Sequence, residues 1–196
     1  MIKLILILLV LLTVSFENLA QEDYLKKGNA FLNSGKLDKA ERAFRDGIKS
    51  DSTNLIYKCQ LGLTLIQEKI YLAAETVLNN VLKIDPKNIA AYWYSGIGYF
   101  ENAQDRKSVG AFLKALPLID KNSEQYYSVN WYIGKCYANL LKTEGLTYAE
   151  TDQMFACYNE YLRLQPNAED SQKIKEYLDR KKARRPPANV KRWVDL

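Results

Sequence analysis

The side chains best suited to covalent or metal chemistry in this chain are its three cysteines, Cys59, Cys136 and Cys157. They form no Cys-x-x-Cys pair, so their spacing indicates neither a zinc ribbon nor a thioredoxin-like redox site. Cys136 and Cys157 could form a disulfide if their Cα atoms come within about 7 Å. Alternatively, all three are small apolar fillers of a core, which is the reading we favour.

Acid–base chemistry has little support, because the sequence contains no histidine. This removes the commonest general base and metal ligand, together with every Ser-His-Asp or Cys-His arrangement. Carboxylates are scattered on faces that the helical period turns to solvent. The short Gly96-Ile97-Gly98 stretch lacks the third glycine and the Lys-Ser/Thr pair of a phosphate loop. We therefore expect no catalytic residues, no metal site and no cofactor.

Recognition chemistry is better represented. The dipeptide Trp93-Tyr94 recurs as Trp131-Tyr132, and each pair begins three residues before a glycine. Tryptophan and tyrosine often dominate the binding energy of interfaces, and burial of one such side chain contributes about 1.5–3 kcal/mol. These rings either anchor a ligand on an open surface or pack between helices as core, and the sequence leaves both readings open.

The elements that carry these residues follow from a spacing of 34 between three glycines, Gly28, Gly62 and Gly96. Each glycine is followed by a large residue after three positions, a small one after twelve and an apolar one after sixteen. Apolar residues recur at intervals of three and four, which is typical of helices. A period of this length indicates stacked pairs of helices, whose close approach the small residues permit. The marker residues are Phe31, Leu65 and Tyr99, then Ala40, Ala74 and Ser108, then Phe44, Leu78 and Phe112.

The pattern resembles the tetratricopeptide repeat. Tyr24 and Tyr92 precede their glycines by four, and Pro86 follows its glycine by 24, as in that family. A fourth, irregular unit begins at Gly134 and reaches its proline, Pro166, only after 32 residues. The resemblance implies an all-α fold, a right-handed superhelical solenoid of antiparallel helix pairs with a C-terminal capping helix.

The domain organisation follows from the same register. Residues 1–20 predict an export signal, because an apolar run follows Lys3 and is shorter than the roughly 20 residues of a membrane span. This predicts a location in the periplasm or cell envelope, and whether the segment is cleaved stays open. We expect tetratricopeptide-like repeats at 21–54, 55–88, 89–122 and 127–168, then a capping helix and basic tail at 169–196.

In the resembled family, the first helix of each pair lines a concave surface. The resemblance therefore implies a mostly apolar partner-binding groove that takes a protein or peptide partner. Some family members clamp a C-terminal carboxylate in this groove, but only Asn29 matches that set, so apolar anchors fit the ligand better. The groove residues are Leu25, Asn29, Leu63, Ile66, Trp93, Tyr94, Ile97, Phe100, Trp131, Tyr132 and Lys135.

The net charge of +5 is concentrated in the tail, where residues 172–196 hold nine Lys or Arg and three Asp or Glu. The tail could fray, fold back through Trp193 onto the repeats, or contact an anionic membrane surface; we favour the first two together. The export signal argues against nucleic acid as a partner. The predicted function is an exported scaffold for protein–protein interaction. The alternative is an assembly subunit that uses the groove and tail for self-association or membrane-surface attachment.

Overall fold

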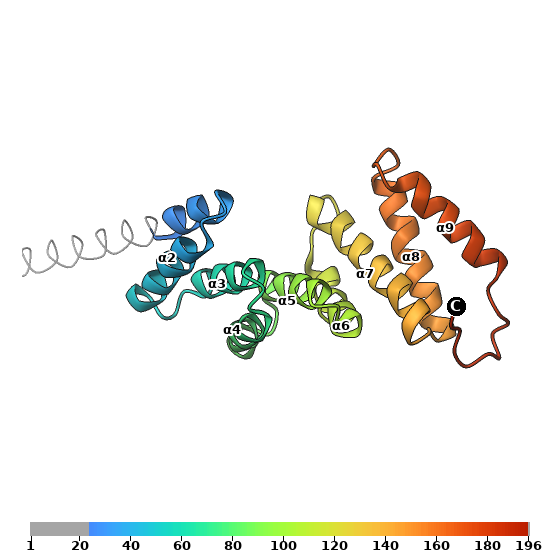
Figure 1. The fold of residues 1–196 in the computed structure, drawn as a ribbon, viewed down its shortest axis with the longest axis horizontal. Coiled ribbons are helices and arrows are strands. Elements are labelled where there is room, and N and C mark those ends of the chain that lie inside the picture. Colours follow the sequence, from blue (N-terminus) through green and yellow to red (C-terminus); the bar gives the residue numbers. More distant parts are fainter. Residues whose placement is uncertain (1–23, 196) are drawn as a thin grey trace, which may run out of the picture. The chain divides into compact units, whose positions relative to one another are not determined.

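The structure of the chain is a computed structural model that describes residues 24–195 (Figure 1), so the export signal predicted at 1–20 lies outside the described residues. Within the described residues the regular secondary structure is helical, apart from one isolated antiparallel bridge between Leu146 and Trp193. This confirms the all-α class predicted from the sequence. The chain divides into two compact units, one ending at Pro86 and one starting at Lys87.

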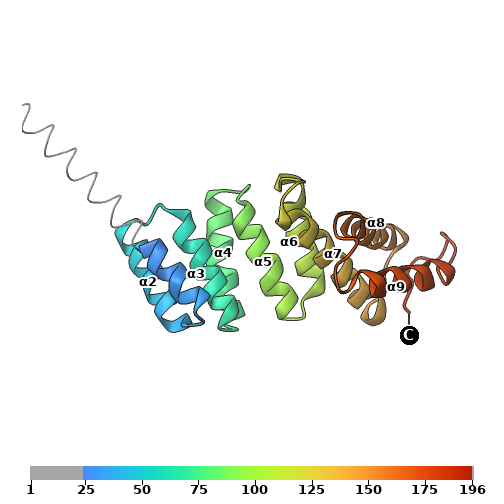
Figure 2. The ribbon, with the colours of Figure 1, turned by 90° about the horizontal axis from the view of Figure 1, so that it is seen from above.

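The first unit consists of helix pairs that pack on one another. Figure 2 shows α2, α3 and α4 side by side, after a helix at residues 24–33. The side chain of Asn54 accepts a hydrogen bond from the N–H of Ile56 and so caps α3. The bounds are α2 Leu37–Ser50, α3 Leu55–Gln67 and α4 Tyr71–Ile84.

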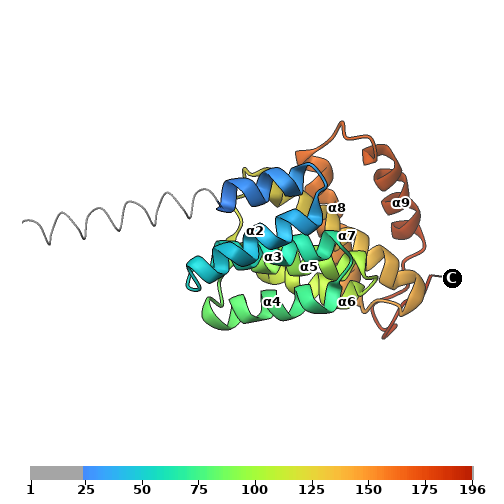
Figure 3. The same ribbon diagram turned by 60° about the vertical axis from the view of Figure 1, so that its left-hand side comes forward.

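The second unit continues with two further pairs and a last single helix. That helix, α9, follows α8 and lies next to it (Figures 1 and 3). Thr147 and Glu150 form a reciprocal capping box at the start of α8. None of the helices within residues 24–195 combines the length and hydropathy needed to cross a bilayer. The bounds are α5 Ile89–Glu101, α6 Asp105–Ala115, the 3-10 turn η1 Leu116–Leu118, α7 Glu124–Thr143, α8 Tyr148–Leu164 and α9 Ser171–Ala183.

The repeating glycines are the points where the two helices of a pair touch. A Cβ added to Gly96 would lie 2.6 Å from a ring carbon of Phe112, and one added to Gly62 would lie 2.6 Å from Leu78. In both pairs the two residues are sixteen positions apart, as the sequence spacing implies. Gly134 instead faces Tyr158, 24 positions on, at 2.7 Å. The extra length of the fourth repeat, the one formed by α7 and α8, therefore lies between these two residues.

The turns between paired helices also repeat the same backbone conformation, although the residue types at the equivalent positions differ. Gly35, Lys69 and Ala103 occupy the same place in successive pairs, and all three have positive φ, at 69°, 62° and 54°. In each turn the next residue donates to a carbonyl five positions back, as in the 2.8 Å bond from Gln104 N to Tyr99 O. This left-handed closure of a helix favours glycine, which only the first turn has.

The core of the second unit extends from α5 to α9. The last helix contributes Ile174 and Leu178, both buried, which agrees with its predicted capping role. All three cysteines are buried, which agrees with the filler reading, and Cys136 and Cys157 are not joined by a disulfide. Burial raises the pKa of each thiol, to about 12 for Cys136.

Candidate functional site

Four of the predicted groove residues lie in the first unit. Leu25, Asn29 and Leu63 are half-buried there, on the helix at 24–33 and on α3. Ile66 is only 1% exposed, so its predicted place on an open surface is wrong. The reason is that α3 is buried over most of its circumference, which leaves Ile66 no solvent-facing side.

The other predicted residues lie in the second unit, where most of the aromatic ones meet. The ring of Tyr132 stacks on Phe112 with centroids 5.0 Å apart and contacts Phe100 and Trp131 edge-on, each at 5.1 Å. Trp93 contacts Phe112 and Tyr132 at 5.5 and 5.9 Å. We call these five residues the ring cluster. Burial, followed by the charge of Glu101, raises the pKa of Tyr132.

The structure shows that these aromatic residues pack as core, and their role as ligand anchors stays a prediction. Trp93, Phe100, Trp131 and Tyr132 pack against the core, yet each keeps an exposed fraction. Ile97 also packs on the core, Tyr94 is half-buried on α5, and Lys135 is exposed on α7.

Beside the ring cluster lies a cavity of about 270 Å³, which we call the aromatic cavity. Its walls are four rings, three from α7 and one from α8, together with a serine and an aspartate. The aromatic walls of this hollow suit an apolar side chain of a ligand, and the tyrosine hydroxyls, Ser128 and Asp170 add polar groups to its lining. The residues are Tyr127, Ser128, Trp131, Tyr132, Tyr161 and Asp170.

Asp170, immediately before α9, holds two of these rings in place. Its carboxylate accepts hydrogen bonds from Trp131 Nε1 at 2.6 Å and from the hydroxyl of Tyr161 at 2.7 Å. Burial, followed by this bond to Asp170, raises the pKa of the Tyr161 hydroxyl. The cavity is therefore organised before any ligand arrives, which lowers the entropic cost of binding.

A second cavity, of about 300 Å³, lies between α7 and α9 and shares Trp131 and Asp170 with the first. We call it the basic cavity, because its rim carries four cationic side chains and a single carboxylate. It is lined by Trp131, Lys135, Ala138, Asn139, Lys142, Tyr158, Asp170, Lys173, Ile174, Tyr177 and Arg180.

The tail folds back onto the connection between α7 and α8 and does not enter the ring cluster. Leu146 and Trp193 exchange two backbone hydrogen bonds of 2.8 Å, and the N–H of Asp195 donates to Leu141 O at 3.0 Å. The carboxylate of Asp195 pairs with Lys181 on α9. The sequence left several conformations open for the tail. In the structure the tail folds back onto the repeats at Trp193.

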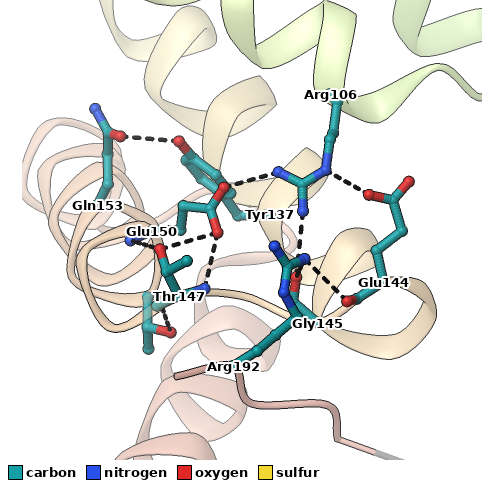
Figure 4. A network of polar contacts seen from close by, with 9 residues as sticks. Arg106, Tyr137, Glu144, Gly145, Thr147, Glu150, Gln153 and Arg192 are labelled. Atoms are coloured by element: carbon teal, nitrogen blue, oxygen red, sulfur yellow. Dashed lines mark hydrogen bonds and ion pairs between the residues drawn. The ribbon is translucent and has the colours of Figure 1, made fainter. Parts of the chain in front are cut away.

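Two arginines reinforce the same connection (Figure 4). Arg106 on α6 pairs with Glu144 and, at 2.7 Å, with Glu150. Arg192 of the tail donates to the carbonyls of Glu144 and Gly145 at 3.1 and 3.2 Å. Burial alone would raise the pKa of Glu150, but its bonds to Thr147 and Arg106 lower it overall. In the part of the chain that the structure describes, no group of three or more His, Cys, Asp or Glu could hold a metal ion.

Several lining residues were missed by the sequence reasoning. Tyr127 precedes Trp131 by one helical turn, so extension of the tryptophan stripe toward the start of α7 would have found it. Lys173 and Arg180 lie on α9 and Asp170 immediately precedes it, so all three lie outside the repeat register. The periodicity therefore carried no signal for them.

Comparisons with known proteins agree with this architecture. A family model described as tetratricopeptide repeat matches residues 24–54. A TPR repeat-containing protein of Methanocaldococcus jannaschii is 25% identical over 181 residues, which cover 81% of this chain and 32% of that protein. The peroxisomal targeting signal receptor of Saccharomyces cerevisiae is 27% identical over 119 residues, covering 57% of this chain and 18% of the receptor. The chain thus spans a third or less of the length of these relatives.

Solved structures give the same result for the fold. A structure of MamA superposes with a TM-score of 0.64 at 17% identity, covering 86% of this chain and 90% of that one. The TPR domain of Arabidopsis OM64 gives a TM-score of 0.54 at 20% identity, covering 63% of this chain and 98% of the domain. Together with the paired helices and their packing glycines, these matches show that the chain has the fold of tetratricopeptide repeat proteins, and residues 24–54 match the repeat itself.

Proposed function

We propose that this protein is a non-enzymatic scaffold that binds a protein partner through the second unit, with the aromatic cavity as the anchor site. The observation that carries this proposal is a cavity walled by four rings, two of them fixed by Asp170. An apolar side chain of the partner enters the cavity and packs on Trp131 and Tyr132. Burial of one such side chain contributes about 1.5–3 kcal/mol, and the preorganised walls lose little freedom on binding.

The proposal includes Trp93, Tyr94, Ile97 and Phe100 as the neighbouring surface that the partner covers, with Lys135 at its edge. In the first unit Leu25, Asn29 and Leu63 remain proposed contacts. The proposed place of action is the periplasm or cell envelope, and it rests on the apolar run within residues 1–20. Tetratricopeptide arrays serve many unrelated complexes, so the fold alone does not name the partner.

Photocrosslinking from position 127 in cells would identify the partner, and calorimetry with the purified partner would test the site. We expect Trp93→Ala combined with Trp131→Ala to weaken binding at least about tenfold, as for aromatic hot spots. Ser128→Lys fills the mouth of the aromatic cavity without removing a ring, and should weaken binding similarly. Trp193→Ala is the matched control, because this third tryptophan lies in the tail. Unchanged affinity in both aromatic-cavity variants would refute the proposal.

The alternative of self-association through the tail finds less support. The described contacts of Trp193, Arg192 and Asp195 are to the protein's own α7–α8 connection and α9. Sedimentation of the protein with and without residues 184–196 separates the two functions. A tail-driven oligomer would fall to monomer on truncation.

A further inference from the structure

The basic cavity has more positive charge than its own structure uses. Lys135 and Lys142 on α7 face Lys173 and Arg180 on α9, and within residues 24–195 none of the four forms an ion pair. The one carboxylate of the cavity, Asp170, already accepts bonds from Trp131 and Tyr161. Because the cavity contains no other carboxylate, an anionic ligand would meet an excess of cations there.

The positive potential reaches into the adjoining core. Lys181, next to Arg180 on α9, has a pKa below its usual value, first because it is buried and then because Arg184, Lys142 and Arg180 lie near it. Lys181 also forms an ion pair with Asp195 of the tail. The Lys142 and Arg180 end of the cavity therefore lies beside a buried lysine whose pKa these two cations help to lower.

The walls between the cations are apolar. Trp131, Tyr158 and Tyr177 present rings to the cavity, with Ala138 and Ile174 between them. A flat array of lipid head groups would contact only the rim of such a hollow. A chain with carboxylates and methylene groups, in contrast, can enter it and use both the cations and the rings.

The helices also set a length for the ligand. Trp131 and Lys142 are eleven residues apart on α7, which is about 16 Å at 1.5 Å per residue. An extended peptide advances about 3.3 Å per residue, so a segment of about five residues spans the length of the cavity. Lys135 and Lys142 are separated by seven residues, as are Lys173 and Arg180. Two cationic levels thus lie about 10 Å apart along each helix, or about three residues of extended chain.

We propose that the basic cavity binds an extended acidic peptide segment of about five residues, with two carboxylates about three positions apart. The outer carboxylates pair with Lys135 and Lys173 at one level and with Lys142 and Arg180 at the other, and the intervening side chains lie on the tyrosines. This proposal rests on the proposed scaffold function and names the chemistry of the partner. It assigns the partner an acidic stretch beside the apolar residue that enters the aromatic cavity.

The test is fluorescence anisotropy with the full chain and a labelled pentapeptide that has glutamate at positions 1 and 4 and leucine between them. We expect saturable binding that weakens as salt rises. Lys142→Glu combined with Arg180→Glu should lower the affinity at least about tenfold, since like charges then face the ligand. Lys175→Glu is the matched control, because Lys175 is exposed on α9 but outside the cavity. Circular dichroism checks that each variant is folded.

Three outcomes would overturn the inference. The first is equal loss of affinity in Lys175→Glu and in the cavity variants, which would indicate unspecific attraction to a basic surface. The second is full competition by inorganic phosphate at the peptide's own concentration. The third is binding to phosphatidylserine vesicles, but not to the peptide, that the cavity variants abolish. Peptide binding that survives while Ser128→Lys leaves the natural partner's affinity unchanged would refute the scaffold proposal and retain this one.

Discussion

Two glycines of the second unit, Gly96 and Gly110, should respond to alanine in opposite directions. Both lie within helices, so alanine gains about 0.5–1 kcal/mol of helix stability at either site. A Cβ at Gly96 would meet three ring atoms of Phe112 at 2.6–2.7 Å, whereas a Cβ at Gly110 meets nothing within 4 Å. Only the first site opposes the gain from the backbone.

The size of that opposition follows from the surroundings of Phe112. Its side chain is fully buried and its ring stacks on Tyr132 at 5.0 Å, so it cannot move outward freely. Overpacking of this kind costs about 1–3 kcal/mol. After the helix gain, we expect Gly96→Ala to lower the free energy of unfolding by about 1–2 kcal/mol. Gly110→Ala should raise it by about 0.5–1 kcal/mol.

Denaturant unfolding followed by tryptophan fluorescence measures this difference in the relevant unit, because all three tryptophans lie after Lys87. The midpoints should move apart with little change in slope. Phe112→Leu should partly rescue Gly96→Ala, giving a non-additive double mutant. If Gly96→Ala matched the unmodified protein, or if both alanines shifted the midpoint the same way, the packing role of the repeat glycines would be refuted.

Four further predictions concern the turns, the tail, the ion pairs and the thiols. Ala103→Gly should raise stability by about 1 kcal/mol, because φ is 54° there; a lower melting temperature would contradict this. Trp193→Ala should speed amide exchange at Leu146, whose N–H donates to Trp193 O; unchanged exchange would mean that the tail does not hold this turn. Arg106→Gln should cost about 1 kcal/mol or less at pH 7, since the pairs are partly exposed. Because the folded pKa of Glu150 lies below its ordinary value of 4.5, that cost should fade as pH drops through the folded pKa; a loss that persisted in acid would point to packing instead. The thiols should react with a thiol reagent only after denaturation, and stability should fall above about pH 9, because unfolded thiols ionise near 9.0 while the folded ones remain neutral; their folded pKa values are about 11 for Cys59 and about 12 for Cys136 and Cys157.

The spacing of a few small residues was enough to predict the helix pairs. Gly28, Gly62 and Gly96 each face the side chain sixteen positions on, so the contact follows from sequence register alone. The positive φ of Lys69 and Ala103 was equally accessible, since both align with Gly35 at the same period. Their residue types concealed it, because sequence reasoning looks for glycine in left-handed turns.

The sequence does not show which helix faces are covered by segments outside the repeats, such as α9 and the tail. The place of Ile66 on an open surface was implied by the resemblance alone, and a pattern of apolar residues does not show how many sides of a helix are covered. The same limit applies to Asp170, whose bonds to Trp131 and Tyr161 join residues 39 and 9 positions away. Hydrogen bonds of this kind depend on how α9 docks, and no periodicity encodes them.

The departure of the fourth repeat from the period explains why the basic cavity and the contact site of the tail lie there. In the third repeat, α5 ends at Glu101, five residues after its packing glycine. A fourth repeat of regular length would therefore end its first helix near residue 139. Instead α7 continues to Thr143. The additional turn carries Lys142, which forms one end of the basic cavity, and Leu141, which receives the tail through Asp195. A deletion that restored the regular length of α7 would thus remove both a cation of the basic cavity and the contact site of the tail. It would leave the aromatic cavity near the start of α7 in place.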